Sequence, residues 1–438
     1  MGVVIDGKVS IDMKAVKNRI DANIQRIYKE DDSPEALEKL GVDVITGAAK
    51  FKDPKTLSVC ITTSSSAYNG NTNDNTNGNT NDNKNDNEGG DGEFDVCAND
   101  GILIATGARP TPPQIKGIDQ VDYITYEEAF SLDEIPKTMT VIGGGPIGCE
   151  LAQAYSRLGA KVTVVASGLL PREEPETGEV MQRVFESEGI KVTNSRVQSV
   201  DGSGGNIHTV LCQDGEKISG DLLLVAIGRI PTVTGMDLEK LGVALNDNGG
   251  IKVDTKLQTS VKGLYAAGDC TGDRQFTHYA GYQGAVGARN ILLPLTDPGV
   301  IDQVPATTFT DPEVASIGLT EKEAKAEFGD NKVAVAFQLI NETDRGICEG
   351  NKEGFIKIVY KSRGYKILGA TIASPVAGEL IAEIAMAMKT GLSFDMLATV
   401  MHTYPSHSFA LQSMAAEVYY DKLVKSKPLL NFLKWLGL

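Results

Sequence analysis

Apolar positions near the start of the chain follow a helical rhythm. Between residues 11 and 31, five aliphatic residues recur three to five positions apart: Ile11, Val16, Ile20, Ile24 and Ile27. This spacing predicts an amphipathic helix. The pattern then changes to that of short strands in VDVITGAAKF and TLSVCITT, and again in EFDVC.

A polar segment interrupts these strands. Asn occupies every odd position from 69 to 87, between the strand-like pieces LSVCI and EFDVC. Such a composition cannot bury apolar surface, so we expect a disordered insert over residues 63–92. The cost of closing a loop grows slowly with its length, and we therefore interpret the insert as an expanded hairpin loop.

From residue 101 the pattern is that of an α/β protein. Buried strands are expected at five places: GILIATG, TMTVIGGGPIG, AKVTVVA, DLLLVAIG and GLYAAGD. After about residue 303 the pattern becomes α+β, with paired strands in GFIKIVYK and ILGATIAS. The apolar stretch AGELIAEIAMAMKTG predicts a helix that Gly391 ends.

Composition and residue spacing argue against several kinds of binding partner and metal or disulfide site. The 42 basic and 58 acidic residues give a net charge of −16, which argues against nucleic acid and anionic membranes as partners. The six cysteines show no CxxC spacing and the four histidines no HExxH spacing, so we predict neither a disulfide framework nor a metal site. No apolar run is long enough to predict a transmembrane helix, and the start MGVVIDGKVS lacks a signal-peptide pattern.

The stretch VIGGGPIGCELAQAY, residues 141–155, carries the first chemical motif. Gly143, Gly145 and Gly148 form GxGxxG between a predicted strand and a predicted helix. The first glycine permits a tight turn, the second lets the backbone approach a pyrophosphate, and the third allows close packing of helix and strand. The helix N-terminus would then hold the phosphates of a dinucleotide.

The end of the next strand bears on the choice of nucleotide. An NAD site normally has an acidic residue there for the ribose 2′-hydroxyl, but this chain has Ala166. Without that carboxylate a 2′-phosphate is not repelled, and Arg172 would attract it. This favours NADPH over NADH. The alternative is that Arg172 pairs with Glu173 or Glu174 on the surface.

Seven motifs in chain order resemble those of the pyridine nucleotide-disulfide oxidoreductases, most closely the mercuric-reductase-like branch near the dihydrolipoamide dehydrogenases: IATGARPTPP, VIGGGPIGCELA, LLPREEPE, VAIGRIPT, LYAAGDCTG, TFTDPEVASIGLTEKEA and HTYPS. The resemblance covers nearly the whole chain apart from the Asn-rich insert. It implies an α/β fold with Rossmann-like FAD and NAD(P) domains, an α+β dimerisation domain, and a homodimer.

The resemblance also implies domain boundaries. It places the remainder of an incomplete FAD domain at 1–128, the NAD(P) domain at 129–247 and a returning FAD segment at 248–302. The dimerisation domain would occupy 303–425 and a C-terminal tail 426–438. The apolar tail KPLLNFLKWLGL is expected to dock on the partner subunit or lie exposed, rather than bind lipid.

Family roles transfer to matching positions of this sequence, each with plain packing as the alternative. Glu150 matches a glutamate near the nicotinamide, and Gly228 matches a glycine of the NAD(P) site. The remaining matches concern FAD: Thr106 and Gly107 would lie against it, Asp269 would bind its ribityl–phosphate region, and Thr277, His278, Tyr279 and Ala280 would lie beside the isoalloxazine.

The chain departs from the family pattern at its beginning. The resemblance implies that residue 1 follows the first FAD motif and the CxxxxC redox pair, since the nearest cysteines, Cys60 and Cys97, lie 37 positions apart. We therefore expect this chain alone to purify without stoichiometric FAD and without disulfide reductase activity. A targeting segment would also lie upstream, so the sequence does not determine the cellular compartment of the protein. The cytoplasm is the default expectation.

The C-terminal motif departs as well. In HTYPSHSF, Tyr404 stands where the family's general base would be, and Phe409 where its glutamate partner would be. A tyrosine titrates near pH 10 and is a poor base at pH 7. Mercuric reductase likewise has a tyrosine there, which fits a metal-ion substrate. We expect His402 and His407 to serve packing or lie exposed rather than bind a metal.

Two function hypotheses follow. The first is an FAD- and NAD(P)H-dependent oxidoreductase acting on a small molecule or a metal ion. The second is a non-catalytic protein that keeps the NAD(P) fold and dimerises.

Cys149 and Cys270 lie at predicted helix starts, where a thiol pKa can fall, but buried and inert cysteines are the favoured interpretation.

Overall fold

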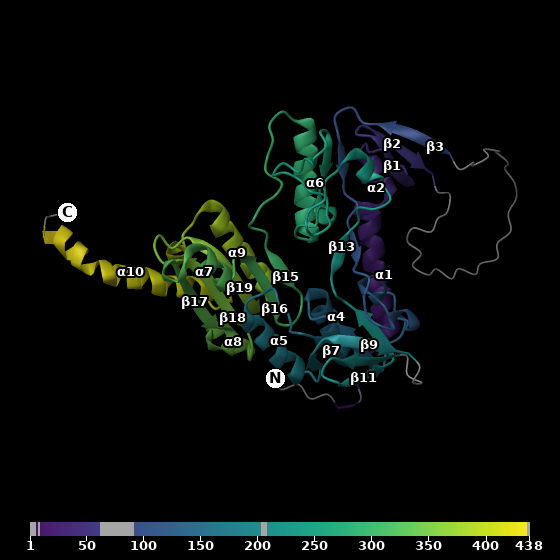
Figure 1. Cartoon of the computed structure of the whole chain (residues 1–438). Helices are drawn as coiled ribbons and strands as arrows, with labels where there is room; N and C mark the ends of the chain where they lie inside the picture. The colour runs from purple at the N-terminus through teal and green to yellow at the C-terminus, as the bar shows by residue number, and fades with distance from the viewer. Residues whose placement is uncertain (1–5, 8, 62–91, 203–207, 436–438) are drawn as a thin grey trace. The chain divides into compact units, whose positions relative to one another are not determined.

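The computed structural model describes residues 6–7, 9–61, 92–202 and 208–435. The chain forms two compact units, each assembled from segments far apart in the sequence (Figure 1). Unit 1 comprises Met1–Thr111, Glu128–Glu134 and Arg229–Ile301; unit 2 comprises Pro112–Glu127, Ile135–Gly228 and Asp302–Leu438. Helix α3 (Tyr126–Ala129) has residues in both units.

Unit 1 begins with the predicted amphipathic helix, which is confirmed as α1 (Met13–Ile27). Asp12 caps it, because its side chain accepts a hydrogen bond from Ala15 N at 3.0 Å. The helix continues as a π-helical turn, Tyr28–Asp32, and Ser33 then caps α2 (Pro34–Lys39).

A three-stranded antiparallel sheet follows, formed by β1 (Ala48–Asp53), β2 (Thr56–Cys60) and β3 (Glu93–Cys97). Strands β2 and β3 pair along their whole length, from Thr56 opposite Cys97 to Cys60 opposite Glu93. The expected hairpin is therefore confirmed. The Asn-rich insert expected over residues 63–92 lies outside the described residues, apart from Gly92.

The rest of unit 1 contains two strand pairs and a long helix. Strands β4 and β14 pair in parallel, β5 and β13 pair antiparallel, and helix α6 packs on β4. An apolar core joins β1, β4 and β14, with Phe51, Ile104 and Leu264 buried in it. The elements are β4 (Ile102–Ile104), β5 (Ala108–Pro110), β13 (Arg229–Pro231), β14 (Leu264–Ala266), α6 (Thr277–Leu292) and the 3-10 turns Leu238–Leu241 and Gly268–Thr271.

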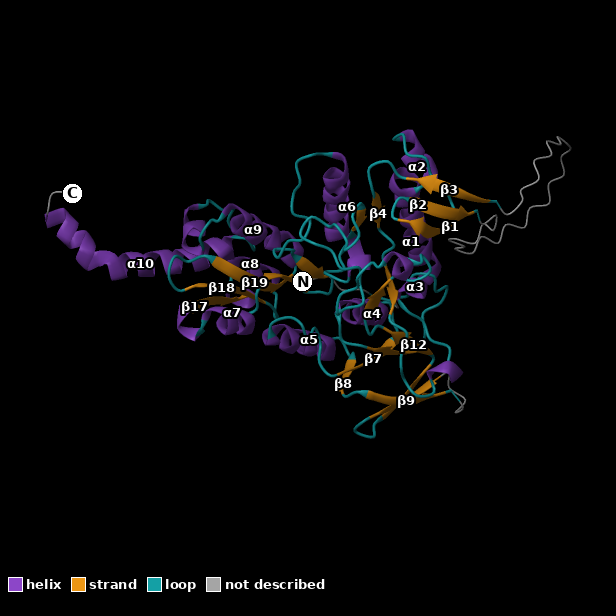
Figure 2. Ribbon diagram, turned by 45° about the horizontal axis from the view of Figure 1, so that its top comes forward, coloured by secondary structure: helices purple, strands orange, loops and turns teal. Residues whose placement is uncertain are grey.

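Unit 2 contains a parallel sheet in the order β12-β6-β7-β8, which confirms the predicted α/β class. Helices α4 and α5 follow β6 and β7, and a second, antiparallel sheet has the order β11-β10-β9 (Figure 2). The elements are β6 (Thr138–Ile142), α4 (Pro146–Arg157), β7 (Lys161–Ala166), α5 (Pro175–Ser187), β8 (Lys191–Asn194), β9 (Val197–Asp201), β10 (His208–Cys212), β11 (Lys217–Gly220), β12 (Leu222–Val225) and the 3-10 turn Ile118–Gln120.

The remainder of unit 2 is a five-stranded antiparallel sheet in the order β15-β16-β19-β18-β17. The predicted strand pair is confirmed as β18 and β19, and the predicted helix as α9, ended by Gly391 in the left-handed conformation. The elements are β15 (Ala306–Thr308), β16 (Glu313–Gly318), α7 (Glu321–Phe328), β17 (Val333–Leu339), α8 (Asp344–Glu349), β18 (Phe355–Lys361), β19 (Ile367–Ser374), α9 (Ala377–Thr390), α10 (Phe409–Trp435) and the 3-10 turns Asp330–Lys332, Ile340–Glu342 and Phe394–Thr399.

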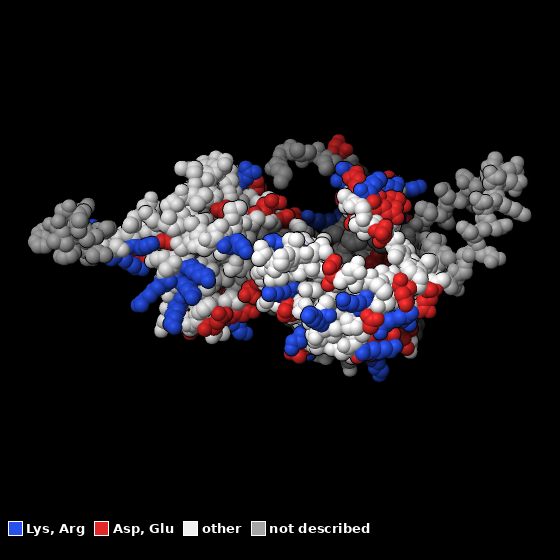
Figure 3. Space-filling view, turned by 90° about the horizontal axis from the view of Figure 1, so that it is seen from above, with Lys and Arg blue, Asp and Glu red and all other residues white. Residues whose placement is uncertain are grey.

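Side-chain alternation along β18 divides this sheet into two faces. Ile356 and Ile358 pack with α9 and α10 in one apolar core, whereas Val359 packs with α7 on the other side (Figure 2). Basic and acidic side chains lie interspersed on the face shown in Figure 3. Among the described residues, no helix combines the length and apolar character that a membrane crossing requires.

Candidate functional site

Three parallel strands of unit 2 end at one edge of their sheet. Ile142, the last residue of β6, lies opposite Val165 of β7 and Val225 of β12. The segments that follow these strands therefore meet, and each holds residues predicted for nucleotide binding: Gly143–Gly148, Ala166–Arg172 and Ala226–Gly228. In parallel sheets this edge is where ligands bind.

The three fingerprint glycines differ in what surrounds them. A Cβ on Gly143 or Gly148 would collide with backbone, with the carbonyl of Ala226 and of Gly143 respectively, and Gly143 has a φ of +119°. Gly145 has no atom within 4 Å of such a Cβ and is the N-cap of α4. Two glycines thus serve the turn and its packing, and the third keeps open space above the helix N-terminus, as a bound pyrophosphate requires.

The loop after β7 lies on the glycine turn. Leu170 N donates a 2.7 Å hydrogen bond to Gly144 O, and a Cβ on Gly144 would collide with the carbonyl of Gly168. Ala166 is buried and Arg172 exposed. Gly228, with a φ of +119°, is exposed after β12.

The surface pairing considered for Arg172 does not occur among the described residues. Glu174 binds Lys357 Nζ at 3.0 Å and Glu321 N at 2.5 Å instead. Glu173 hydrogen-bonds Ser316, and burial raises the pKa of its carboxyl. Arg172 is therefore available to an anionic ligand.

Helix α4 presents one polar face to the turn between β15 and β16. Glu150, Gln153 and Arg157 share this face because they stand three and four residues apart. Glu150 accepts a 2.7 Å hydrogen bond from Phe309 N. Burial raises the pKa of the Glu150 carboxyl, and that hydrogen bond only partly opposes the shift.

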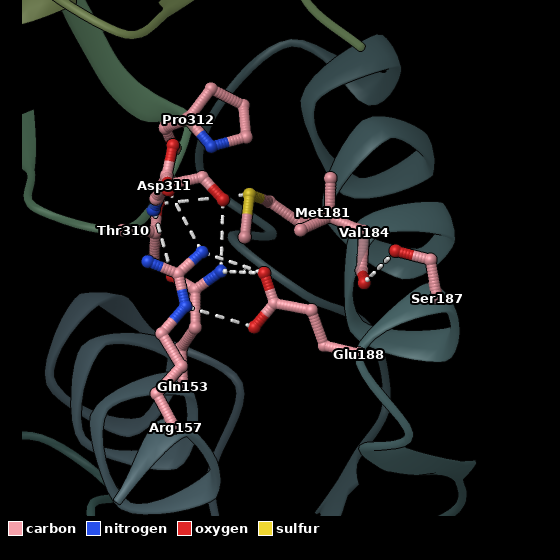
Figure 4. Close-up of polar contacts among 9 residues, drawn as sticks. All are labelled: Gln153, Arg157, Met181, Val184, Ser187, Glu188, Thr310, Asp311 and Pro312. Carbon is pink, nitrogen blue, oxygen red and sulfur yellow. Dashed lines mark hydrogen bonds and ion pairs between the residues drawn. The ribbon is translucent and has the colours of Figure 1, made fainter. Parts of the chain in front are cut away.

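Figure 4 shows the other two residues of this face. The Gln153 amide accepts from Asp311 N at 2.7 Å and donates to Asp311 O at 2.8 Å. Arg157 bridges the Glu188 carboxylate, at 2.7 Å, and the Asp311 carboxylate, at 2.8 Å. We did not predict these two residues from the sequence, although their helical spacing from Glu150 was a usable signal.

Unit 1 gathers the residues predicted to contact FAD. Strands β4 and β14 run parallel, so the segments after them, Thr106–Gly107 and Gly268–Asp269, leave the pair at the same edge. Cys270 donates to Ile104 O at 3.4 Å, which fixes the two segments together. The carboxyl edge of parallel strands is again the expected place for a ligand.

Helix α6 carries the third segment that is predicted to contact FAD. Gly268 N donates a 2.8 Å hydrogen bond to Gln283 Oε1, and a Cβ on Gly268 would come within 3.0 Å of Ala280 Cβ. At its start, Thr277 and His278 are exposed, whereas Tyr279 is buried and donates to Asp273 at 3.0 Å. The structure thus brings these residues together, with an open helix start beside them.

Asp269 supplies the acidic group of this site. Its side chain is 11% exposed and pairs with Arg229 Nη2 at 2.6 Å. Thr106 Oγ1 donates a 2.6 Å hydrogen bond to Thr232 O, and Gly107 has a φ of +70° with open space around it. A partly buried acceptor beside open backbone fits the hydroxyl groups of a ribityl chain.

The C-terminal motif forms a separate polar cluster in unit 2. Tyr404 is exposed and donates to Asp344 at 3.0 Å, which raises the pKa of the phenol and makes it a still poorer base. Its ring packs edge-on against Phe409. A cavity of about 120 Å³ beside them is lined by Asp344, Arg345, Tyr404 and Phe409, among others.

The two histidines of this motif bind different carboxylates. His402 Nε2 lies 2.7 Å from Glu383, and His407 Nε2 lies 2.9 Å from Glu349. The described part of the chain contains no group of three or more side chains suited to a metal ion.

The cysteines near the two nucleotide motifs are buried. Cys149 and Cys270 have no exposed surface. Burial raises the pKa of Cys149 to about 12 and raises that of Cys270 as well. Desolvation therefore outweighs the helix N-terminus, and the expectation that both cysteines are buried is confirmed.

Comparison with known families agrees with this arrangement. Residues 38–284 match the pyridine nucleotide-disulphide oxidoreductase family, and residues 304–415 match the dimerisation domain of that family. The first match alone spans more than half of the chain. The chain therefore belongs to the pyridine nucleotide-disulphide oxidoreductases.

Its curated relatives include mercuric reductases. The chain is 35% identical to that of Shigella flexneri, covering 83% of this chain and 60% of the relative. It is 35% identical to the mercuric reductase of Bacillus cereus, covering 73% of this chain and 51% of the relative. It is 34% identical to that of Streptomyces lividans, covering 76% of this chain and 72% of the relative. The chain thus spans about half to three quarters of the length of these relatives.

Solved structures show the same fold. The HOCl-induced flavoprotein disulfide reductase RclA from Escherichia coli matches with a TM-score of 0.78 at 23% identity, over 93% of this chain and 86% of that one. LpdA from Mycobacterium tuberculosis matches with a TM-score of 0.77 at 26% identity, over 94% and 84%.

Proposed function

We propose that the protein is an FAD- and NADPH-dependent oxidoreductase of the mercuric-reductase-like type, acting on a small molecule or a metal ion. The glycine turn of unit 2 carries the proposal, because Gly145 keeps space open where Gly143 and Gly148 only permit packing. NADPH would supply a hydride when bound. The N-terminus of α4 would bind its pyrophosphate, and Glu150 would lie beside its nicotinamide.

The preference for NADPH rests on Ala166 and Arg172. It is tested by isothermal titration calorimetry with NADPH and NADH. NADPH should bind more tightly, and Ala166→Glu should reverse the order because its carboxylate repels the 2′-phosphate and accepts a bond from the ribose hydroxyl. Ala166→Gln, of the same size without the charge, is the control. Equal or tighter binding of NADH by the unchanged protein would contradict the preference.

We propose that the FAD segments of unit 1 contact the flavin through Thr106, Gly107, Asp269 and the start of α6. Titration with FAD, followed by quenching of flavin fluorescence, measures this contact. Asp269→Asn should weaken FAD binding about tenfold, since a hydrogen bond to a charged group contributes about 1.5 kcal/mol. Asp297→Asn, which alters another arginine-paired acid of unit 1, should leave it unchanged.

The match to a dimerisation domain supports a homodimer as the proposed assembly. Several apolar side chains of that domain are exposed, with Phe309 at 70%, Met386 at 68% and Met401 at 88%. If they form one contiguous patch in the folded protein, burial in a dimer interface would account for it. Light scattering should give about twice the chain mass of 46.7 kDa. A monomer at micromolar concentration, with the circular dichroism of a folded protein, would contradict it.

A second candidate is a non-catalytic NAD(P)-binding and dimerising protein. It is favoured by the cysteines, since no two of them have the CxxxxC spacing and three of the six are buried. The two candidates separate when the FAD-supplemented protein is mixed with NADPH and mercuric ion or a disulfide. Steady NADPH oxidation supports the enzyme, whereas NADPH binding without oxidation supports the second candidate.

A further inference from the structure

One lysine of unit 2 lies where a strand is otherwise apolar. Lys357 interrupts FIKIVYK, the sequence of β18, and its side chain is only 4% exposed. It lies on the face of β18 opposite Ile356 and Ile358, which pack with α9 and α10. A buried ammonium group is costly unless carboxylates surround it.

Three carboxylates do surround Lys357. Its Nζ lies 2.7 Å from Glu176, 2.9 Å from Glu321 and 3.0 Å from Glu174. Burial disfavours the charged lysine, but the hydrogen bonds to these three groups outweigh it and raise the pKa of Lys357. The lysine is therefore charged in the folded protein and attracts all three carboxylates.

Glu174 is the most deeply buried of the three, at 2% exposed. Its second oxygen accepts a 2.5 Å hydrogen bond from Glu321 N, at the start of α7. Glu174 is also the residue that precedes α5. Lys357 and α7 together thus fix the point where the loop after β7 enters its helix.

The other end of that loop is fixed as well. Leu170 N donates to Gly144 O of the glycine turn at 2.7 Å, and Glu173 N donates to Leu170 O at 3.0 Å. Only three residues, 171–173, separate Leu170 from Glu174, and Arg172, which is exposed, is the middle one. The direction of Arg172 therefore depends on both fixed points.

We propose that Lys357 is a positioning residue that favours NADPH over NADH by fixing the loop that carries Arg172. This inference rests on the proposed preference for NADPH. The lysine itself does not touch the nucleotide. It holds Glu174, so that Arg172 is ordered before the 2′-phosphate arrives and loses less freedom on binding.

Replacement of Lys357 should weaken the binding of NADPH but not that of NADH. Three carboxylates would then repel one another without a shared cation, and the loop would lose its fixed point at Glu174. Arg172 would become disordered, which weakens binding of the 2′-phosphate. NADH has no 2′-phosphate, so its affinity should change little.

The test compares the ratio of NADH to NADPH dissociation constants, measured by calorimetry, in four proteins: the unchanged chain, Arg172→Ala, Lys357→Met and the double variant. Arg172→Ala should lower the ratio about tenfold, the usual size of a hydrogen bond to a charged group. Lys357→Met should lower it at least about threefold. The double variant should match Arg172→Ala, because both changes remove one effect.

Lys325→Met is the matched control. Lys325 also binds Glu321 but is more exposed and does not contact Glu174, so this variant should leave the ratio unchanged. Glu174→Gln is the second variant, in case Lys357→Met fails to fold. It keeps an acceptor for Glu321 N, removes the charge that Lys357 holds, and should also lower the ratio.

The failures can be told apart. If Arg172→Ala leaves the ratio unchanged, both the NADPH preference through Arg172 and the role of Lys357 are wrong. If Arg172→Ala lowers the ratio while Lys357→Met or Glu174→Gln weakens both nucleotides equally, only the positioning role is wrong, and Lys357 serves packing alone.

Discussion

His208 lies at the start of β10 with no exposed surface. Its Nε2 forms a 2.8 Å hydrogen bond with Thr140 Oγ1 of β6, while its Nδ1 is buried with no partner among the described residues. Gly220 leaves no spare room, since a Cβ there would lie 3.0 Å from His208 Cε1. A second proton on this ring would have neither water nor an acceptor, so burial lowers the pKa of His208 from 6.5 to about 4.

This shift makes stability depend on pH in a defined direction. Between pH 6.5 and pH 4 the unfolded chain binds a proton at His208 that the folded chain does not, so stability falls as the pH falls. The loss from this residue is about 2 kcal/mol at pH 5 and about 3 kcal/mol at pH 4. Its contribution to the pH dependence fades above pH 6.5 and is small by about pH 7.5.

His208→Gln removes the titration and keeps an amide within reach of Thr140. Urea unfolding of both proteins at several pH values gives the difference in the free energy of unfolding. The unchanged protein should lose about 2 kcal/mol more than the variant between pH 7 and pH 5.

A direct measurement tests the cause. With only four histidines in the chain, the imidazole NMR signals can be assigned by substitution. The His208 signal should show no titration above pH 5. A signal that titrates near pH 6.5, or equal pH dependence in His208→Gln and the unchanged protein, would refute the argument from burial.

Other contacts give predictions of smaller scope. Gly145→Ala should keep the melting temperature but weaken NADPH binding about tenfold, whereas Gly148→Val should destabilise the fold by about 3 kcal/mol, as calorimetry of each would show. Gln153→Leu leaves both backbone groups of Asp311 without their partner and should cost about 2 kcal/mol in urea unfolding; Arg157→Leu, at an exposed position, should cost less than about 1 kcal/mol. A thiol reagent should modify three cysteines in the folded protein and all six after unfolding, and faster reaction of a buried thiol would contradict the packing; the exposed three are Cys60, Cys97 and Cys348.

Local sequence patterns predicted the parts of the fold that depend on residues close together in the sequence. The glycine turn, its strand and α4 follow from the backbone freedom that Gly143 needs. Helix α9 ends where Gly391 adopts a positive φ, and the β2–β3 hairpin follows from strand patterns on both sides of the insert. In each case the decisive residues are close in sequence or carry a recognisable alternation.

The polar contacts that hold unit 2 together were not predictable in this way. Lys357 was visible as one charge in an apolar strand, but its partner Glu174 lies 183 positions away. Cys149 differs, because the sequence already favoured a buried cysteine there, and burial raises its pKa although it lies near the start of a helix. The partners of a buried charge such as Lys357 come from distant parts of the chain, and a single sequence does not reveal them.

Helix α4 connects the proposed nucleotide site with the five-stranded sheet of unit 2. The N-terminus of α4 begins at Gly145, and its side chains at 150, 153 and 157 bind the turn that joins β15 to β16. The loop after β7 is tied to the same sheet through Lys357 of β18. Helix α4 and the loop after β7, which border the proposed site, are therefore both held by residues of the dimerisation domain. We therefore expect unfolding of that domain to weaken nucleotide binding, even though the proposed contacts to the nucleotide lie outside it.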